Sequence, residues 1–378
     1  MIYLDNSATS FPKPRAVYEA YNNAIKYYHS NPGRGGYKNS LLTAEKIYEV
    51  REKTAAFFGE ENCENIAFTA NCTTAINVVI KGVLKDGDHA VISDLEHNAI
   101  LRPLEKLRLQ GKIKYDIFKT DFYRPANTLA GLRRCINERT KLVICTHASN
   151  VTGVTLPIAA IGKLCREQQI IFAVDAAQSG GILPLDKAEY HIDYLCLAPH
   201  KGLFAPMGLG VLIGDGSALD TLTEGGTGSL SSSAVQPDFM PDRLESGTMN
   251  VGAIIALGAG IDYIQNIGRE NIYLKEKEHI LQLHDSFKEL QSVRSYVHYD
   301  KLEAFAPVYA FNIAGMPCET AAQKLSENGI CVRAGLHCAP LAHQKIGTVD
   351  RGTIRISPSF FTTSKEINCT IDTIKKFI

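Results

Sequence analysis

Five apolar, strand-like segments, each followed by polar residues, constrain the fold of this chain more than any other feature. They lie at 65–70, 89–94, 141–149, 170–178 and 193–201. Helix-like segments separate them, for example 158–169. Strands that alternate with helices predict an α/β fold, with a largely parallel sheet and helices on both faces. Because ligands bind beyond the carboxyl ends of the strands in such sheets, the polar residues there predict one shared site.

The pattern changes after residue 250, where we expect a second and smaller part of the fold. One long helix is predicted over about 252–291, followed by strand-like pieces at 307–314, 329–335 and 353–359. A mixture of helices and short strands is typical of an α+β domain. The length of 378 residues fits a large domain with a smaller partner.

Composition narrows the classes of partner and compartment. Lysine plus arginine and aspartate plus glutamate both number 40, so no net charge draws the chain to nucleic acid or to an anionic membrane. The longest uncharged apolar run, 251–261, is too short to span a bilayer, and the N-terminus lacks the pattern of a signal peptide. The ten cysteines include no CxxC pair and predict no disulfide framework, so we expect a reducing cytoplasm. No residue set has metal-ligand spacing, and no metal site is expected.

Two residues at the strand ends are candidates for covalent and electrostatic catalysis. Lys201 ends an apolar segment. Desolvation there lowers the pKa of its amine, which then acts as a nucleophile and forms a Schiff base. Asp175 follows five apolar residues and needs a partner, such as the protonated ring nitrogen of pyridoxal phosphate. The structural alternatives are a lysine that reaches solvent and an aspartate that caps the next helix.

A ring and two hydroxyl groups at other strand ends suit a flat, phosphorylated cofactor. His97 follows a strand, and its imidazole can stack on a cofactor ring, although a histidine satisfied within a loop is the commoner case. Thr73 and Thr74 stand at a strand-to-helix turn, where free N–H groups and the helix dipole attract a phosphate. A simple threonine N-cap uses the same geometry, so the sequence leaves both interpretations open.

The last third of the chain supplies a thiol and a guanidinium group. Cys338 lies in an irregular segment with Arg333 and His337 close in sequence, and a nearby cation favours the thiolate. Arg355 stands between β-branched residues on a short strand, from which it can bind a carboxylate with two hydrogen bonds. A buried cysteine and a surface salt bridge are the alternatives.

Together these motifs resemble the class V aminotransferase-like family of pyridoxal-phosphate enzymes, and within it the Suf-type cysteine desulfurases and selenocysteine lyases. The matching segments are 3–9, 31–36, 69–77, 95–99, 148–153, 173–178, 198–202, 244–250, 333–339 and 353–357. The resemblance implies the fold type I of pyridoxal-phosphate-dependent transferases, with a mainly parallel seven-stranded sheet. It also implies a large domain at 15–255 and a smaller α+β domain made of 1–14 and 256–378.

The resemblance assigns pyridoxal 5'-phosphate as the cofactor and gives its contacts. Lys201 would carry it covalently, Asp175 would pair with the ring nitrogen, and Gln178 would bind the phenolic oxygen. His97, a catalytic residue of the family, would stack over the ring. The residues expected to hold the phosphate are Thr73, Thr74, His200 and, from the neighbouring subunit of a homodimer, Thr248.

The resemblance also implies the substrate and the reaction. Asn150, Arg333 and Arg355 would bind L-cysteine, with Asn150 also close to the cofactor. Cys338 would accept the sulfur as a persulfide, L-alanine would be released, and a sulfur-acceptor or scaffold protein would receive the sulfur for iron–sulfur cluster or other synthesis. No nucleic acid or membrane partner is expected.

Other functions remain open on the sequence alone. An aminotransferase or lyase for another small amino acid needs no thiol at Cys338, whereas desulfuration does. A selenocysteine lyase uses nearly the same residues, and a catalytically silent α/β binding protein would bind no coloured cofactor. Two positions differ from many relatives: Ala198 replaces a serine, and Leu336 replaces a histidine.

Overall fold

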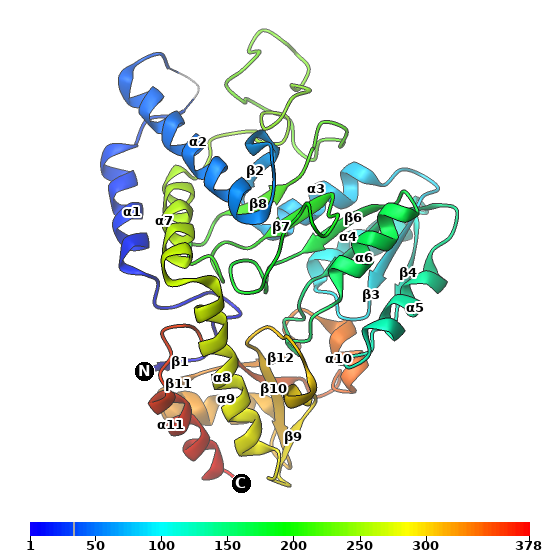
Figure 1. Ribbon diagram of the computed structural model, residues 1–378, viewed down its shortest axis with the longest axis vertical. Coiled ribbons are helices and arrows are strands. Elements are labelled where there is room, and N and C mark those ends of the chain that lie inside the picture. Colours follow the sequence, from blue (N-terminus) through cyan, green and yellow to red (C-terminus); the bar gives the residue numbers. More distant parts are fainter. Residues whose placement is uncertain (33–34) are drawn as a thin grey trace.

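The computed structural model describes residues 1–32 and 35–378 and has a larger and a smaller part, linked by a bent pair of helices (Figure 1). The segment expected to match the family at 31–36 therefore lies partly outside the described residues. The helices are α1 (Arg15–Tyr27), α2 (Lys38–Phe58), α3 (Cys72–Val83), α4 (Asn98–Leu109), α5 (Pro125–Cys135), α6 (Ile158–Glu167), α7 (Val251–Ile267), α8 (Arg269–Phe287), α9 (Cys318–Glu327), α10 (Pro340–Ile346) and α11 (Ser364–Lys375).

A seven-stranded sheet forms the centre of the larger part, as predicted. Its order is β2 (Ile66–Thr69), β8 (Gly210–Ile213), β7 (Tyr194–Leu197), β6 (Ile171–Asp175), β5 (Thr140–Thr146), β3 (His89–Ser93) and β4 (Lys114–Phe118). All neighbours are parallel except β8, which runs antiparallel to both β2 and β7. The mainly parallel sheet of the α/β prediction is thereby confirmed.

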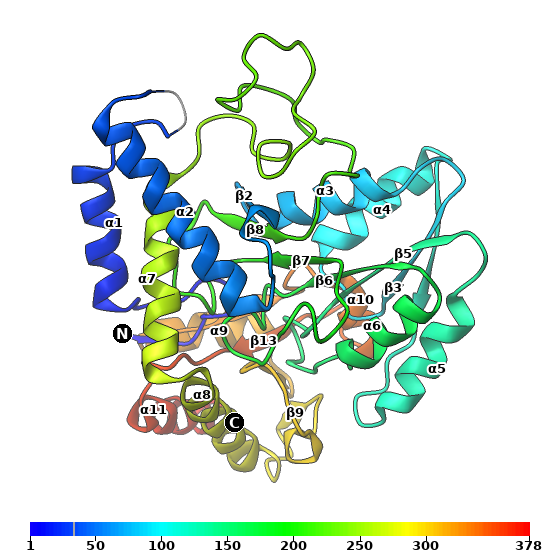
Figure 2. The ribbon, with the colours of Figure 1, turned by 45° about the horizontal axis from the view of Figure 1, so that its top comes forward.

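Alternate residues of each central strand face opposite sides of the sheet, and both sides are buried. In β5, Val143 and Cys145 pack into one core with residues of α2, α6 and α7. Leu142 and Ile144 pack into the other core with residues of α3 and α4. Burial on both faces explains why the strands are almost continuously apolar in the sequence. Figure 2 shows α2 and α7 on one side of the sheet and α3 and α4 on the other.

The smaller part contains a four-stranded antiparallel sheet in the order β12 (Arg333–Gly335), β13 (Thr353–Ile356), β10 (Tyr309–Ile313) and β9 (Val293–Ser295). The N-terminal strand β1 (Ile2–Tyr3) pairs in parallel with β11 (Ile330–Cys331). The first residues of the chain therefore lie beside residues more than 300 positions later. The domain boundaries at 15–255, with 1–14 and 256–378 in the other domain, remain a prediction.

The single long helix expected at 252–291 is wrong, because the chain breaks it into α7 and α8 at Gly268. The two helices meet at 81°, and Gly268 has a φ of 87°, which only glycine adopts at low cost. Among the described residues, no single helix is long and apolar enough to cross a membrane. The bent pair passes that test only by joint length and composition.

Candidate active site

The carboxyl ends of the parallel strands bring the predicted site residues to one edge of the sheet. Asp175 is the last residue of β6, and His97, Asn150 and Lys201 lie within four residues after β3, β5 and β7. Thr74 follows β2, which points the same way as β7 because β8 runs antiparallel to both. Parallel strands end at a common edge, so the topology places these side chains together.

Lys201 lies in a turn that follows the buried strand β7. Its backbone N–H donates to the carbonyl of Ala198 at 3.1 Å, and its own carbonyl accepts from Phe204 N at 3.1 Å. Its amine makes no hydrogen bond or ion pair among the described residues. Burial lowers the pKa of Lys201, and the charge of Asp175 only partly opposes this effect. The amine is thus a base and nucleophile nearer to neutral pH than an ordinary lysine.

Asp175 is 4% exposed and has no cation bonded to it within the described residues. Its Oδ1 accepts from Ala177 N at 2.9 Å and lies 3.7 Å from the sulfur of Cys72. The bond to Ala177 N lies in a turn, and the next element after β6 is the strand β7, so the helix-capping alternative is wrong. The charge of this carboxylate also acts on both Lys201 and His97, so Asp175 has electrostatic influence over the site as well.

His97 forms the N-cap of α4, where its Nδ1 accepts from Ala99 N at 3.0 Å. This bond fixes Nδ1 as an acceptor and leaves the other ring nitrogen to carry the hydrogen. Burial lowers the pKa of His97, against the opposing charge of Asp175. The ring is therefore neutral and held in place at the sheet edge.

The segment that carries Cys338 is anchored to this edge through its backbone. Asn98 N donates to the carbonyl of Cys338 at 2.7 Å, and Asn150 Nδ2 donates to the carbonyl of His337 at 2.7 Å. Both His337 and Cys338 have left-handed backbones, with φ of 50° and 56°. Such strain in non-glycine residues gathers at functional sites. The side chain of Cys338 is exposed, so an outside thiol can approach it.

Arg355 is not part of a surface salt bridge, because it is only 2% exposed. Its Nη2 lies 2.7 Å from Asp5 Oδ1, and its Nη1 donates to the carbonyl of Asn150 at 3.1 Å. Arg333 Nε lies 3.1 Å from the other oxygen of the same aspartate. Arg355 Nε is buried without a partner among the described residues. One donor of the guanidinium thus stays available for a further acceptor.

The N-terminal segment closes one side of the site. Gln178 Nε2 donates to the carbonyl of Ser7 at 3.1 Å, and the carbonyl of His200 accepts from Ser10 N at 3.0 Å. His200 Nδ1 is buried and has no partner among the described residues. Burial lowers the pKa of His200 to about 4, so its ring is neutral.

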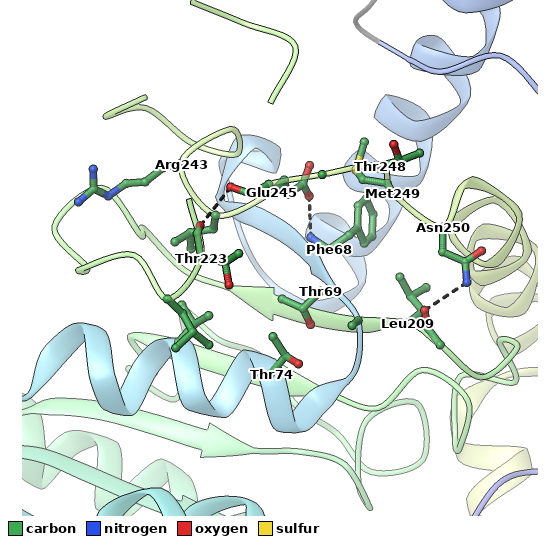
Figure 3. Close-up of a pocket in the computed structure, with 17 residues that line it drawn as sticks. Phe68, Thr69, Thr74, Leu209, Thr223, Arg243, Glu245, Thr248, Met249 and Asn250 are labelled. Atoms are coloured by element: carbon green, nitrogen blue, oxygen red, sulfur yellow. Dashed lines mark hydrogen bonds between the residues drawn. The ribbon is translucent and has the colours of Figure 1, made fainter. Parts of the chain in front are cut away.

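Thr74 and Thr248 line one pocket of about 310 Å³, whereas Thr73 is not among its lining residues (Figure 3). Asn71, not a threonine, caps α3, since its Oδ1 accepts from Thr74 N at 2.9 Å. The strand β8 passes very close to this cap: a Cβ on Gly210 would lie 2.2 Å from the carbonyl carbon of Asn71. Glycine at 210 therefore allows the close packing that shapes the pocket wall.

A buried ion pair fixes the segment that carries Thr248. Arg51 Nη2 lies 2.5 Å from Glu245 Oε2, and Glu245 Oε1 accepts from Phe68 N at 2.6 Å. Arg51 also donates to the carbonyl of Ile66 and lies over the ring of Phe68, 4.7 Å from its centre. Burial raises the pKa of Glu245, and Arg51 opposes it.

Removing one partner of this pair should destabilise the protein strongly. We expect Glu245→Ala to lower the free energy of unfolding by about 3–5 kcal/mol, because it leaves Arg51 as an unpaired buried charge. Urea unfolding measures the loss. The double variant Arg51→Leu with Glu245→Leu should lose much less, since neither charge then remains buried. Equal losses in the single and double variants would contradict this explanation.

Sequence reasoning missed several residues that the fold brings to the site. Asp5 holds both arginines, Cys72 contacts Asp175, and the carbonyl of Ser7 binds Gln178. Asp5 and Ser7 lie within the 3–9 segment that resembles the family, and this was the only available signal. Their partners lie more than 170 positions away, so no local pattern could identify the contacts.

The fold also brings together three possible metal ligands from α8 and the segment that follows β9. His284, His298 and Asp300 place their ligand atoms within 4.8 Å of one another, and His284 Nε2 lies 3.2 Å from Asp300 Oδ1. Zinc bonds of about 2.0–2.1 Å require ligand atoms roughly 3.3 Å apart in a tetrahedral site. The ligand atoms of the three residues are spread over up to 4.8 Å, which is wider than this spacing. The contact between His284 and Asp300 already explains why these side chains lie together.

Comparisons with known proteins identify the family of this chain. The profile of the family described as Aminotransferase class-V matches residues 2–369. Proteins named "Probable cysteine desulfurase" from Methanothermobacter thermautotrophicus and Pyrococcus abyssi are each 31% identical; the alignments cover 99% and 100% of this chain and 94% of each relative. A cysteine desulfurase structure from Thermococcus onnurineus has a TM-score of 0.92 and 31% identity over 100% of this chain and 94% of the other. The cysteine desulfurase CsdA from Escherichia coli has a TM-score of 0.88 and 25% identity, covering 99% and 94%.

Proposed function

This chain belongs to the aminotransferase class-V family, and on that premise we propose that it is a pyridoxal-phosphate-dependent cysteine desulfurase. It converts L-cysteine to L-alanine and takes up the sulfur on Cys338. One observation carries the proposal: the buried amine of Lys201, in the field of Asp175, shares a sheet edge with the anchored loop of an exposed cysteine. Relatives named cysteine desulfurases, similar along nearly the whole chain, support it.

The residues present fit pyridoxal phosphate. Lys201 has an amine without a partner, and Asp175 has a buried carboxylate without a bonded cation, among the described residues. His200 Nδ1 is a buried ring nitrogen that lacks a partner. In our proposal Lys201 carries the cofactor, Asp175 pairs with its ring nitrogen, and His97 stacks on the ring. The other residues proposed to hold it are Thr73, Thr74, Asn150, Gln178, His200 and, from the neighbouring subunit, Thr248.

The mechanism assigns the proton transfers to Lys201. Pyridoxal phosphate, when bound, supplies an electron sink for the substrate carbon that loses its proton. The lowered pKa of Lys201 gives a neutral amine that can accept this proton and later return one. The carboxylate of Asp175 would keep a proton on the ring nitrogen, because an opposite charge favours the protonated form.

Cys338 performs the sulfur transfer. Its thiolate forms an S–S bond with the substrate sulfur, while the C–S bond breaks and leaves its electron pair on carbon. Protonation of that carbon gives alanine, and the persulfide stays on the enzyme. Because Cys338 is exposed, the thiol of an acceptor or scaffold protein can then attack the persulfide. We also propose a homodimer and a cytoplasmic location, where the ten free cysteines stay reduced.

An amino-acid panel tests the proposed function. Purified protein loaded with pyridoxal phosphate is given L-cysteine, selenocysteine, cysteine sulfinate and other small amino acids, together with a reducing thiol. We expect alanine and sulfide in equal amounts from L-cysteine. A keto acid formed without sulfide would favour an aminotransferase instead, and higher turnover with selenocysteine would favour a selenocysteine lyase.

Arg355→Lys should weaken cysteine binding more than turnover. The unpartnered Nε of Arg355 and its charge suit the substrate carboxylate, and a hydrogen bond to a charged group contributes about 1.5–3 kcal/mol. We therefore expect the KM for L-cysteine to rise about 10- to 150-fold, with a smaller change in kcat. The matched control is Arg351→Lys at an exposed arginine. An unchanged KM would remove Arg355 from the substrate site.

A further inference from the structure

Glu276 is a buried carboxyl group that none of the roles above uses. It lies on α8, is 3% exposed, and its Oε2 has no hydrogen-bond partner among the described residues. Burial raises the pKa of Glu276 from its ordinary 4.5 to about 8, while a backbone hydrogen bond from Phe360 and the charge of Lys275 oppose this only in part. Its carboxyl group is therefore protonated at neutral pH, and the O–H group needs an acceptor.

A small cavity connects Glu276 with the catalytic lysine. Its volume is about 30 Å³, and Glu276 and Lys201 both line it. Its other polar lining residues are Asn6, Ser7, Ser10, Gln178 and Ser359. A water molecule needs roughly 10–15 Å³ of such space and two to four polar partners. The cavity meets both requirements, so one or two waters fit between the carboxyl group and the amine.

We propose that Glu276 is a positioning residue for Lys201, holding a proton that water in this cavity passes to and from the lysine amine. The inference rests on the proposed function, since it concerns the lysine that moves protons there. One proton is transferred: the carboxyl group and neutral amine become a carboxylate and an ammonium group, and the reverse step restores them. Burial shifts the pKa of each group towards that of the other, which makes the exchange easy in both directions.

The charged groups around Glu276 and Lys201 decide how ionisation of one group affects the protonation of the other. Beside Glu276, Lys275 and His279 lie on the same helix, and the N-terminal and Ser359 segments contribute only uncharged residues to the cavity. The charged groups acting on Lys201 are Asp175, Arg355 and Arg333, whereas burial raises the pKa of the Cys72 thiol and keeps it neutral. Once ionised, Glu276 adds a negative charge near the amine, which favours the ammonium form.

Glu276→Gln gives a first test that does not depend on activity. Because the pKa of Glu276 is raised in the folded state, its contribution to stability is complete below about pH 4.5 and is lost as the pH rises towards 8. Glutamine does not ionise, so the variant should gain stability relative to wild type throughout that window. Urea unfolding between about pH 5 and pH 9 measures the difference. A pH-independent difference would overturn the proposal.

The second test measures the protonation of the Lys201 nitrogen in the cofactor-loaded protein. The visible absorption of the lysine-bound cofactor changes when the lysine nitrogen is protonated, so a pH titration gives a midpoint. Above about pH 8 Glu276 is ionised, and its negative charge favours the protonated lysine nitrogen. Over this alkaline part of the titration, Glu276→Gln should therefore lose the protonated form at a pH lower by roughly half a unit or more. Glu278→Gln, an exposed change on the same helix, should leave the titration unchanged. Coincident titrations of Glu276→Gln and wild type would remove the positioning role.

A second variant covers the case of misfolding, and an activity assay separates this inference from the proposed function. If Glu276→Gln does not fold, Glu276→Met removes the same carboxyl group at similar length and is read in the same titration. The alanine and sulfide assay separates the two proposals. A shifted midpoint without alanine from cysteine would leave this inference standing and defeat the proposed function, whereas alanine without a shift would defeat this inference alone.

Discussion

Replacing Lys201 by alanine should remove both the visible absorption of the bound cofactor and the release of alanine from cysteine. Lys201 provides the only covalent link in the proposed site, and its buried amine is the base whose lowered pKa suits proton transfer near neutral pH. General acid–base catalysis alone contributes about 10²- to 10⁴-fold. We expect turnover to fall by at least that factor.

Absorption spectra and an alanine assay on the same preparation measure this result. Lys53→Ala is a suitable control, because Lys53 is a half-exposed lysine paired with Asp262 on the outer helices. The control should keep both the spectrum and the turnover. A Lys201→Ala protein with the wild-type spectrum would show that the cofactor is attached elsewhere.

Cys338→Ala should keep the cofactor spectrum but stop sulfide release from cysteine. The sulfur needs a thiolate that forms the S–S bond, and alanine offers no nucleophile in its place. We expect sulfide production to fall to the level of a control without enzyme. The anchoring bonds of this loop use the backbone of His337 and Cys338, so the substitution should leave the fold unchanged.

The chain offers a matched control for this variant. Cys369 is the other exposed cysteine among the ten, and Cys369→Ala should behave like the wild type. Sulfide assays with and without a reducing thiol, together with the mass of the protein after cysteine treatment, detect the persulfide. Continued sulfide release from Cys338→Ala, or a sulfur adduct on Cys369, would assign the transfer to another group.

Much of the fold was predictable because its signals are local. Strands buried on both faces must be apolar along their length, and the segments at 141–149 and 170–178 show this directly. The break at Gly268 was not predictable, because Gly252, Gly258 and Gly260 lie within α7 without breaking it, so a glycine inside a helical pattern is compatible with either a continuous or a bent helix. The antiparallel strand β8 was also missed, because its four residues, 210–213, form too short an apolar segment to indicate a strand by pattern alone.

The site was predictable in part. Lys201, Asp175 and His97 stand at strand ends, and the topology brings these ends together, as expected. Their individual roles, and those of the other predicted site residues, stay predictions that the experiments above test. The contact of Asp5 with Arg355 joins residues 350 positions apart, and no pattern along the chain indicates such a pair.

The sequence by itself determined the α/β class, the family and the chemical types of the candidate site residues, because apolar periodicity and short motifs depend only on neighbours along the chain. Only the tertiary structure decided which groups share an environment. The N-terminal strand β1 pairs with β11, and this pairing brings Asp5 to the two arginines with which it forms ion pairs. Packing of α8 against the site placed Glu276 at the cavity of Lys201. Burial and long-range contact set these pKa values and contacts, and both arise only when distant segments pack together.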